Sequence, residues 1–551
     1  MKKNISIIIL LSCNLSLHAQ NPVIKLWDYA YGGYSQDYLT CLQQTGDGGF
    51  ILGGFSSSPA GADKTQGSWG HFDFWIVKLN AAGEKEWDKD YGGTGDDRLY
   101  AMQQTKDRGY ILGGISNSGS DGDKTEPDWD SVNFTYDFWI VKTDSLGNKE
   151  WDKDLGGTEN ENLNSIQQTK DGGYILGGSS VSGIGGDKTQ SIWDSGGYTY
   201  DYWIVKIDSL GNKQWDKDLG GTGDDQISAA YQTSNGDYFL AGSSQSAASG
   251  DKSQDTKGEI DYWFIKTDSS GNMIWDKDYG GSLSDIPYDM KITGDGGAII
   301  AGVSNSGISG DKTQANWDNS NTTNDYWLVK IDSIGNKEWD KVLGGTDAEP
   351  RVGNVSQTSD GGYLVAGISY SEISGNKTED NLGIEQTWVV KLDSSSNVEW
   401  DKTIFTTAED ETGYSIRCND GCYLMANYSH AGIGGYKTET GEGFEDYWIV
   451  KFCDSTSIPT NADLAQRVEN NLYVYPNPFK DFITLVLDNK KGEPISLRII
   501  NVLGQTVFTL DENYATANFR KILNLNNLES GIYYVAISIN GQPLSEKILK
   551  Q

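Results

Sequence analysis

The sequence repeats itself seven times, with a period of about 60 to 65 residues, and this period limits the possible folds more than any other feature. Two tryptophans mark each unit. The first lies in an apolar run and recurs at Trp75, Trp139, Trp203, Trp263, Trp327, Trp388 and Trp448. The second precedes a charged run and recurs at Trp27, Trp87, Trp151, Trp215, Trp275, Trp339 and Trp400. A self-similar period in this range is typical of solenoids and propellers, in which each unit packs against its neighbours.

Each unit contains four strand-like segments. In the second unit we predict strands at 99–105, 110–116, 138–143 and 149–155. Gly, Asn and Asp turns join the first pair and the last pair, as in antiparallel hairpins. The third segment is apolar at successive positions, which predicts burial of both faces, and the fourth is half polar, like an outer strand. We therefore predict an all-β, seven-bladed β-propeller with four-stranded blades. A β-solenoid is the alternative, although its coils are usually shorter and its strands parallel.

The two ends of the repeat region predict how the ring closes. Residues 24–31 have the sequence of a fourth strand, but no blade precedes them. The seventh unit ends after its third strand, at 447–452. We expect the N-terminal strand to complete the last blade, because closure removes the sheet edges that promote aggregation.

Residues 1–20 resemble a secretory signal peptide. Lys2 and Lys3 form a basic start, an apolar stretch follows, and Ala19 offers a small residue at the cleavage point. The apolar stretch is too short to span a bilayer. Cys13, which follows Leu-Leu-Ser, leaves a lipoprotein as the alternative. We assign residues 21–455 to the propeller.

The composition changes after the propeller. A polar linker, 456–471, leads to residues 472–551, whose short half-buried strands with Gly and Pro between them predict a small β-sandwich. This stretch contains Tyr-Pro-Asn-Pro at 475–478, Leu-Gly-Gln at 503–505, Ser-Gly-Ile-Tyr-Tyr-Val at 530–535 and a basic end. With these motifs it resembles the C-terminal sorting domain of the type IX (Por) secretion system. A generic adhesive β-sandwich is the alternative.

The resemblance implies a route and a destination. It implies that the type IX secretion machinery, through this domain, carries the chain across the outer membrane of a Gram-negative cell. It also implies that the mature protein is secreted or attached to the outer cell surface.

The charge and the histidine count exclude several functions. Lys and Arg number 44 and Asp and Glu 78, so the formal charge is −34. Such a charge repels nucleic acid and anionic membrane surfaces. Only three histidines are present, one of them in the predicted leader. A His-based zinc site or a Ser-His-Asp triad is therefore hard to build.

Each unit has a long loop that contains Asp-Lys-Thr or a variant of it. Four tryptophans outside both series lie in these loops, at Trp69, Trp129, Trp193 and Trp317. A loop Trp can stack on a sugar ring or a peptide, because it offers a rigid apolar face with an N–H group. The alternative is a lid packed over its own blade. Since rigid scaffolds place function on long loops, we expect the ligand on this face.

The lysine of the loop occurs in every unit, at Lys64, Lys124, Lys188, Lys252, Lys312, Lys377 and Lys437. An active site is a single place, so a residue found in all seven blades predicts a structural latch rather than a catalyst.

An acidic residue lies four positions after the second glycine of each Gly-Gly pair, or four positions after Thr407 where that pair is lost. These acids are Asp37, Asp97, Glu161, Asp225, Asp285, Glu349 and Glu411. We expect them at the start of each innermost strand, around the central channel. A ring of carboxylates can hold Ca²⁺, which prefers many oxygen ligands. The alternative is that each acid accepts backbone N–H bonds or pairs with a lysine.

Two cysteines replace the residues at both ends of one turn in the seventh unit. Cys418 and Cys422 are therefore predicted to form a disulfide in an exported protein. Cys41 and Cys453 come from different strands of adjacent blades, so we expect both to be unpaired.

Together these features predict a secreted or surface-attached propeller that binds glycan or protein on its long-loop face. The residues that repeat account for blade structure and form no recognisable acid–base set. An extracellular polysaccharide hydrolase or lyase, and a passive surface-coat protein, remain the alternatives.

Overall fold

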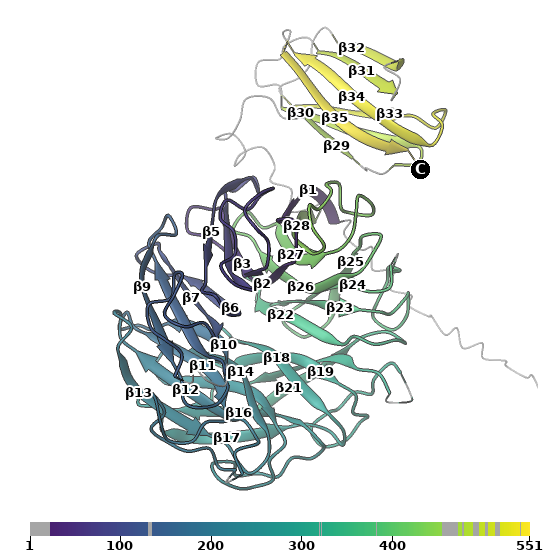
Figure 1. Ribbon diagram of the computed structural model, residues 1–551. Coiled ribbons are helices and arrows are strands. Elements are labelled where there is room, and N and C mark those ends of the chain that lie inside the picture. Colours follow the sequence, from purple (N-terminus) through teal and green to yellow (C-terminus); the bar gives the residue numbers. More distant parts are fainter. Residues whose placement is uncertain are drawn as a thin grey trace, which may run out of the picture. The chain divides into compact units, whose positions relative to one another are not determined.

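The computed structural model describes most of the chain (Figure 1). The described residues are 23–129, 135–194, 196–318, 320, 322–381, 383–454, 472–475, 479–488, 495–501, 505–512, 518–539 and 542–550. The predicted signal peptide, 1–20, and linker, 456–471, lie outside them. The chain divides into two compact units, Met1–Ser457 and Ile458–Gln551.

The first unit consists of seven four-stranded antiparallel sheets (Figure 1). Blades one and two comprise β2 (Asp37–Gln44), β3 (Phe50–Ser56), β4 (Asp73–Leu79), β5 (Lys85–Tyr91), β6 (Asp97–Gln104), β7 (Tyr110–Ser116), β8 (Asp137–Thr143) and β9 (Lys149–Leu155). Blades three and four comprise β10 (Glu161–Gln168), β11 (Tyr174–Ser180), β12 (Asp201–Ile207), β13 (Lys213–Leu219), β14 (Asp225–Gln232), β15 (Tyr238–Ser244), β16 (Asp261–Thr267) and β17 (Met273–Tyr279). Blades five and six comprise β18 (Asp285–Ile292), β19 (Ala298–Ser304), β20 (Asp325–Ile331), β21 (Lys337–Leu343), β22 (Arg351–Gln357), β23 (Tyr363–Ser369), β24 (Gln386–Leu392) and β25 (Val398–Ile404). Blade seven comprises β26 (Asp410–Arg417), β27 (Tyr423–Ser429), β28 (Asp446–Asp454) and β1 (Val23–Tyr31).

The sheets form a closed ring. The innermost strand of each blade contacts that of the next, and β26 of the last blade contacts β2 of the first. The N-terminal strand β1 pairs with β28, with Tyr31 opposite Tyr447 and Ile24 opposite Cys453. This pairing confirms both the seven-bladed propeller and the predicted closure by the N-terminal strand.

One hydrogen bond recurs in all seven blades and links the two tryptophan-marked strands, the third and the fourth. The indole of the buried third-strand Trp donates to an Asp one residue after the second Trp, at 3.0–3.3 Å. The same Asp accepts the backbone N–H of the loop Thr or Ser at 2.7–2.9 Å. In blade seven this Asp is Asp28 of β1, which joins Trp448 across 420 residues of sequence.

Aromatic residues fill the joints between blades. In every blade except the sixth, where it is Thr387, the second residue of the third strand is aromatic and packs on the Trp of the neighbouring blade, for example Phe138 on Trp203 with ring centroids 4.8 Å apart. Trp75 packs on Tyr447 in the same way, which joins the first blade to the last. The third strands are buried along almost their whole length, as their apolar sequence predicts.

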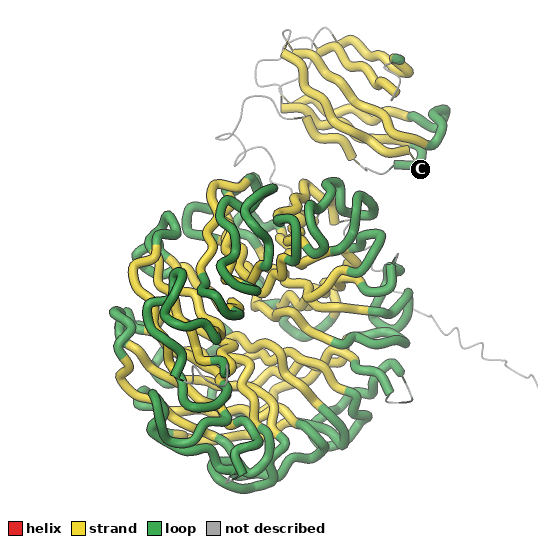
Figure 2. Tube along the Cα trace, in the orientation of Figure 1, coloured by secondary structure: helices red, strands yellow, loops and turns green. Residues whose placement is uncertain are grey.

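The second unit is a small β-sandwich. One sheet contains β29 (Leu472–Tyr475), β30 (Phe482–Asp488) and β33 (Asn518–Asn524). The other contains β31 (Ile495–Asn501), β32 (Thr506–Glu512), β34 (Gly531–Ile539) and β35 (Gln542–Lys550). Leu485 and Val535, from the two sheets, lie in one buried apolar cluster. Figure 2 shows strands and loops along the described residues, among which no helix could cross a membrane.

The structure corrects the predicted disulfide. Cys422 bonds to Cys453, with their Cα atoms 4.3 Å apart. Tyr423 pairs with Phe452 across β27 and β28, so the preceding and following residues face each other. Cys418 instead donates its backbone N–H to the carbonyl of Cys422 at 2.7 Å, while its free thiol packs in the core between blades seven and one. The predictions of a Cys418–Cys422 bridge and of an unpaired Cys453 are therefore wrong.

Candidate functional site

Six of the predicted acids are fully buried and bonded within their own blades. They are Asp37, Asp97, Glu161, Asp225, Asp285 and Glu349. Each accepts the backbone N–H of the second glycine of its Gly-Gly pair, at 2.6–3.2 Å, and a serine hydroxyl. Burial raises the pKa of these carboxyls, that of Asp97 to about 6. Their bonds thus correspond to the alternative we considered, in which the acids satisfy the backbone instead of sharing a calcium ion.

The seventh predicted acid is displaced by one position. Asp410, not Glu411, is fully buried and accepts the backbone N–H of Thr406 at 3.0 Å. Phe405-Thr406 replaces Gly-Gly in this blade, so counting from Thr407 selects the wrong residue. Glu411 is partly exposed and accepts a hydrogen bond from the hydroxyl of Tyr428.

The four loop tryptophans are the largest exposed aromatic rings in the long loops. Trp69, Trp129, Trp193 and Trp317 are 61%, 54%, 49% and 44% exposed, respectively. Each donates its backbone N–H to the Asp that begins the third strand of its own blade, at 2.6–2.8 Å. This bond holds the loop backbone in place at the tryptophan itself.

Three of the four indole rings reach across to the next blade rather than covering their own. Trp129 donates its indole N–H to Asp187 of blade three, and Trp193 donates to Asp251 of blade four, both at 2.8 Å. Trp317 donates to Asn376 of blade six at 2.9 Å. A Cβ built on Gly250 would lie 2.8 Å from the Trp193 ring, so the ring packs directly on the neighbouring loop. These three tryptophans therefore connect adjacent blades and keep part of each ring in solvent.

Blade four shows the same joint made with a different side chain. Lys257 takes the place of the tryptophan, and its Nζ lies 2.9 Å from Asp311 of blade five. Its aliphatic chain packs on Gly310, as Trp193 packs on Gly250. An ion pair can thus replace the indole at this joint, but it offers no aromatic surface.

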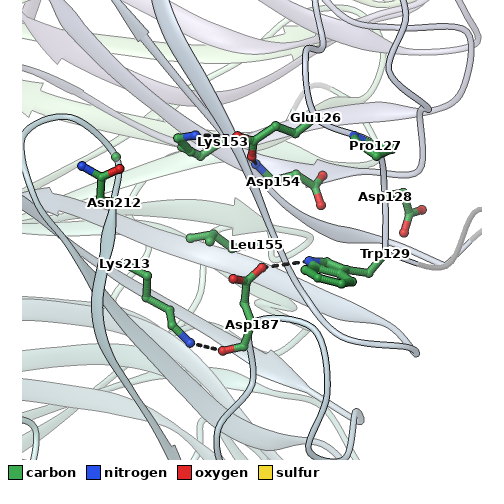
Figure 3. Close-up of a pocket in the computed structure, with 11 residues that line it drawn as sticks. Glu126, Pro127, Asp128, Trp129, Lys153, Asp154, Leu155, Asp187, Asn212 and Lys213 are labelled. Atoms are coloured by element: carbon green, nitrogen blue, oxygen red, sulfur yellow. Dashed lines mark hydrogen bonds and ion pairs between the residues drawn. The ribbon is translucent and has the colours of Figure 1, made fainter.

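Figure 3 shows the groove beside Trp129, between blades two and three. The groove has a volume of about 640 Å³. Its lining includes Glu126, Trp129, Lys153, Asp187 and Asn212. Glu126 and Lys153 form an ion pair of 2.5 Å. An aromatic face flanked by charged and amide groups is suited to a ligand that carries both apolar surface and hydroxyl or amide groups.

The loop lysines are buried latches. In blades one to four each forms an ion pair with the second Asp of the Trp-Asp-Lys-Asp run, as Lys124 does with Asp154 at 2.6 Å. Blades five and six have Val342 and Thr403 at that position. There burial lowers the pKa of the buried Lys312 and Lys377 to about 8. Lys437 of blade seven is also buried, but its Nζ has no hydrogen-bond partner among the described residues. The other six lysines therefore hold the loops to the blades, and none of the seven is accessible to a ligand.

The second unit has a clear counterpart among known protein families. Residues 473–551 match the family described as the secretion system C-terminal sorting domain. With the ring of seven sheets, this match defines the class: a β-propeller protein exported by the type IX secretion system. The sorting domain directs the chain to the cell surface or the extracellular space.

Other comparisons give weaker likenesses. The regulatory protein FlaEY of Caulobacter vibrioides is 26% identical over 190 residues, which is 34% of this chain and 20% of that protein. The chain thus matches about one fifth of that relative's length. Among solved structures, the WD40 domain of Neurospora crassa Pan2 has 9% identity and a TM-score of 0.40, over 78% of this chain and 96% of that one. Sqt1 from Chaetomium thermophilum has 10% identity and a TM-score of 0.38, over 79% of this chain and all of that one.

Proposed function

We propose that the propeller is an extracellular binding domain that contacts a glycan or protein ligand through the tryptophans of its long-loop face. The observation that carries this proposal is that all four loop indoles are 44–61% exposed, while those of Trp129, Trp193 and Trp317 are also bonded at their N–H groups. Bonded rings are held in place before a ligand arrives, so binding costs less side-chain entropy.

The spacing of the tryptophans favours an extended ligand. Trp129, Trp193 and Trp317 bridge the joints between blades two and three, three and four, and five and six. Stacking on one ring contributes about 0.5–1.5 kcal/mol beyond the area buried. Several such contacts along one polymer or one protein surface add through effective concentration, so weak single contacts give a useful total affinity.

The experiment uses the joint of blade four as its guide. Replacing Trp69, Trp129, Trp193 and Trp317 with Lys removes the rings but retains a group that can bond to the next blade, as Lys257 does. We expect this variant to stay folded and to lose binding to bacterial cells and extracellular polysaccharide by about tenfold or more. The converse substitution, Lys257→Trp, adds a fifth ring and is expected to strengthen binding.

The converse variant also controls for charge, since the four lysines add positive charge to an acidic protein. A folded four-lysine variant that binds as tightly as the wild type would overturn the proposal. Turnover of a polysaccharide by the wild-type protein would instead favour a hydrolase or lyase.

A further inference from the structure

A second cluster of chemically active side chains lies at the long-loop end of the innermost strands, apart from the loop tryptophans. It belongs to blade seven and comprises Glu409, Glu411, His430 and Glu445. Glu409 and Glu411 flank the first residue of β26, His430 follows β27, and Glu445 precedes β28. Three segments distant in sequence thus meet at one end of one blade.

The donor atoms of this cluster are close enough to share one ion. A carboxylate oxygen of Glu409, one of Glu411 and a ring nitrogen of His430 all lie within 4.8 Å of one another. His430 Nε2 also lies 3.5 Å from Oε1 of Glu445. Two carboxylates and one imidazole therefore surround one point, and the carboxylate of Glu445 lies beside the imidazole.

Glu445, beside His430, has one carboxylate oxygen that is free to accept a further interaction. Its side chain is only 6% exposed. Oε1 accepts a 3.4 Å hydrogen bond from the hydroxyl of Tyr38, but Oε2 is buried and has no hydrogen-bond partner among the described residues. A buried carboxylate oxygen without a partner is costly, and bound ions are one way in which proteins satisfy such atoms.

The surroundings of the cluster orient its side chains. Tyr428 donates its hydroxyl to Oε2 of Glu411, and Tyr38 holds Glu445. Second-layer hydrogen bonds of this kind fix ligand orientation in metal sites. The backbone is also unusual here, because Thr412 has a φ of 77°, which is rare for a β-branched residue.

The same positions in other blades do not form such a set. In blade four they hold Asp224, Gln226, Gln245 and Ile260. The cluster therefore arises from substitutions specific to blade seven and is not needed to build a blade.

We propose that Glu409, Glu411 and His430, with Glu445 beside His430, bind a divalent transition-metal ion at the long-loop end of blade seven. Imidazole favours Zn²⁺ and neighbouring metals of its row, and carboxylates also suit Mn²⁺. Ca²⁺ takes oxygen ligands only and would leave His430 unused. The site is independent of ligand binding by the loop tryptophans.

The test is isothermal titration of the untagged, EDTA-treated full chain with ZnCl₂, MnCl₂ and CaCl₂. We expect one tight site for Zn²⁺ or Mn²⁺ and weaker binding of Ca²⁺. Glu411→Gln and His430→Ala are each expected to weaken that site by about tenfold or more, because each removes a direct ligand. Circular dichroism of each variant establishes that the fold is intact.

Two matched variants serve as controls. Asp224→Asn changes the acid at the position of Glu409 in blade four, and His71→Ala removes a histidine that lies 3.8 Å from a single carboxylate, Asp96. Both are expected to bind metal like the wild type. Failure of the folded wild type to bind Zn²⁺ or Mn²⁺, or affinity unchanged in His430→Ala, would overturn the proposal.

Discussion

The indole N–H of Trp129 in blade two donates a 2.8 Å hydrogen bond to the carboxylate of Asp187 in blade three. This bond is one of several that link these two repeats, and the backbone N–H of Gln168, for example, also donates to the side chain of Gln103. It also decides which part of the tryptophan is available outside, since the N–H is occupied and the ring is half exposed.

A double-mutant cycle on this pair tests the joint. Trp129→Phe keeps an aromatic ring but removes the donor, and Asp187→Ala removes the acceptor. We expect a coupling energy of about 1 kcal/mol, below the usual value for a hydrogen bond to a charged group because solvent reaches the pair. Urea unfolding measures this coupling energy. Additive effects of the two substitutions on the free energy of unfolding would show that the hydrogen bond does not couple the two blades.

Closure of the ring by β1 makes a second prediction. Asp28→Ala leaves the buried indole of Trp448 and the loop Thr438 without their acceptor, so we expect about 2–4 kcal/mol of destabilisation. Asp216→Ala is the matched change, because Asp216 makes the same bonds to Trp203 and Thr189 inside blade three.

Limited proteolysis separates the two variants. Asp28→Ala should expose β1 to cleavage before Tyr31, whereas Asp216→Ala should leave the N-terminal strand protected. A protected β1 in folded Asp28→Ala would show that this contact does not hold the ring closed.

The disulfide predicts a loss of stability on reduction. Cys422 and Cys453 are 31 residues apart, so their bond restricts the unfolded chain by about 3–4 kcal/mol. Cys453→Ser should lower the unfolding midpoint accordingly. Cys418→Ala keeps the disulfide and should therefore lower the free energy of unfolding by less. Peptide mapping under non-reducing conditions should find the Cys422–Cys453 pair, and a Cys418–Cys422 pair would contradict the structure.

Buried carboxyls at the start of the third strands predict a stability that falls with rising pH. Burial first, and then the neighbouring carboxylate, raise the pKa of Asp201 to about 9 and that of Asp261 to about 8. The unfolded chain releases these protons above about pH 4, whereas the folded chain retains them. The folded state therefore binds more protons between about pH 4 and pH 9, and its stability decreases across this range.

Asp201→Asn tests this pH dependence. The amide cannot ionise but can still accept the backbone N–H of Trp193, and blade six already has Gln386 at this position. The slope of stability against pH should become less negative by up to about 1.4 kcal/mol per pH unit. Asp194→Asn, an exposed change in the same loop, should leave the slope unchanged. An unaltered slope in Asp201→Asn would contradict the raised pKa of Asp201.

The sequence predicted the architecture because its signals are local and repeated. The strand predicted at 110–116 matches β7, and the unpaired fourth strand at 24–31 indicated how the ring closes. The disulfide was missed because it depends on register across two strands. Units one to six have Asn or Asp at the position of Cys453. The signal for the disulfide was that unit seven has cysteine at this position and at 422 as well.

The candidate sites were harder to predict. Counting from Thr407 wrongly placed Glu411 in the series of acids. Phe405 and Thr406 occupy the positions of the Gly-Gly pair, so the count should have started from Thr406. Glu409, His430 and Glu445 are ordinary residues when read singly, and only the folded blade brings them together. Comparison of the seven units position by position would have shown that blade seven differs from the others at these places.

The central claim, that the loop tryptophans contact the ligand, is tested most directly by hydroxyl-radical footprinting of the protein free and bound to its target cells. Mass spectrometry then measures the oxidation of each tryptophan. The account predicts that Trp69, Trp129, Trp193 and Trp317 lose reactivity on binding, while buried Trp75 and its equivalents react little in either state. Unchanged oxidation of all four loop rings, with protection of the tight-turn face instead, would contradict it.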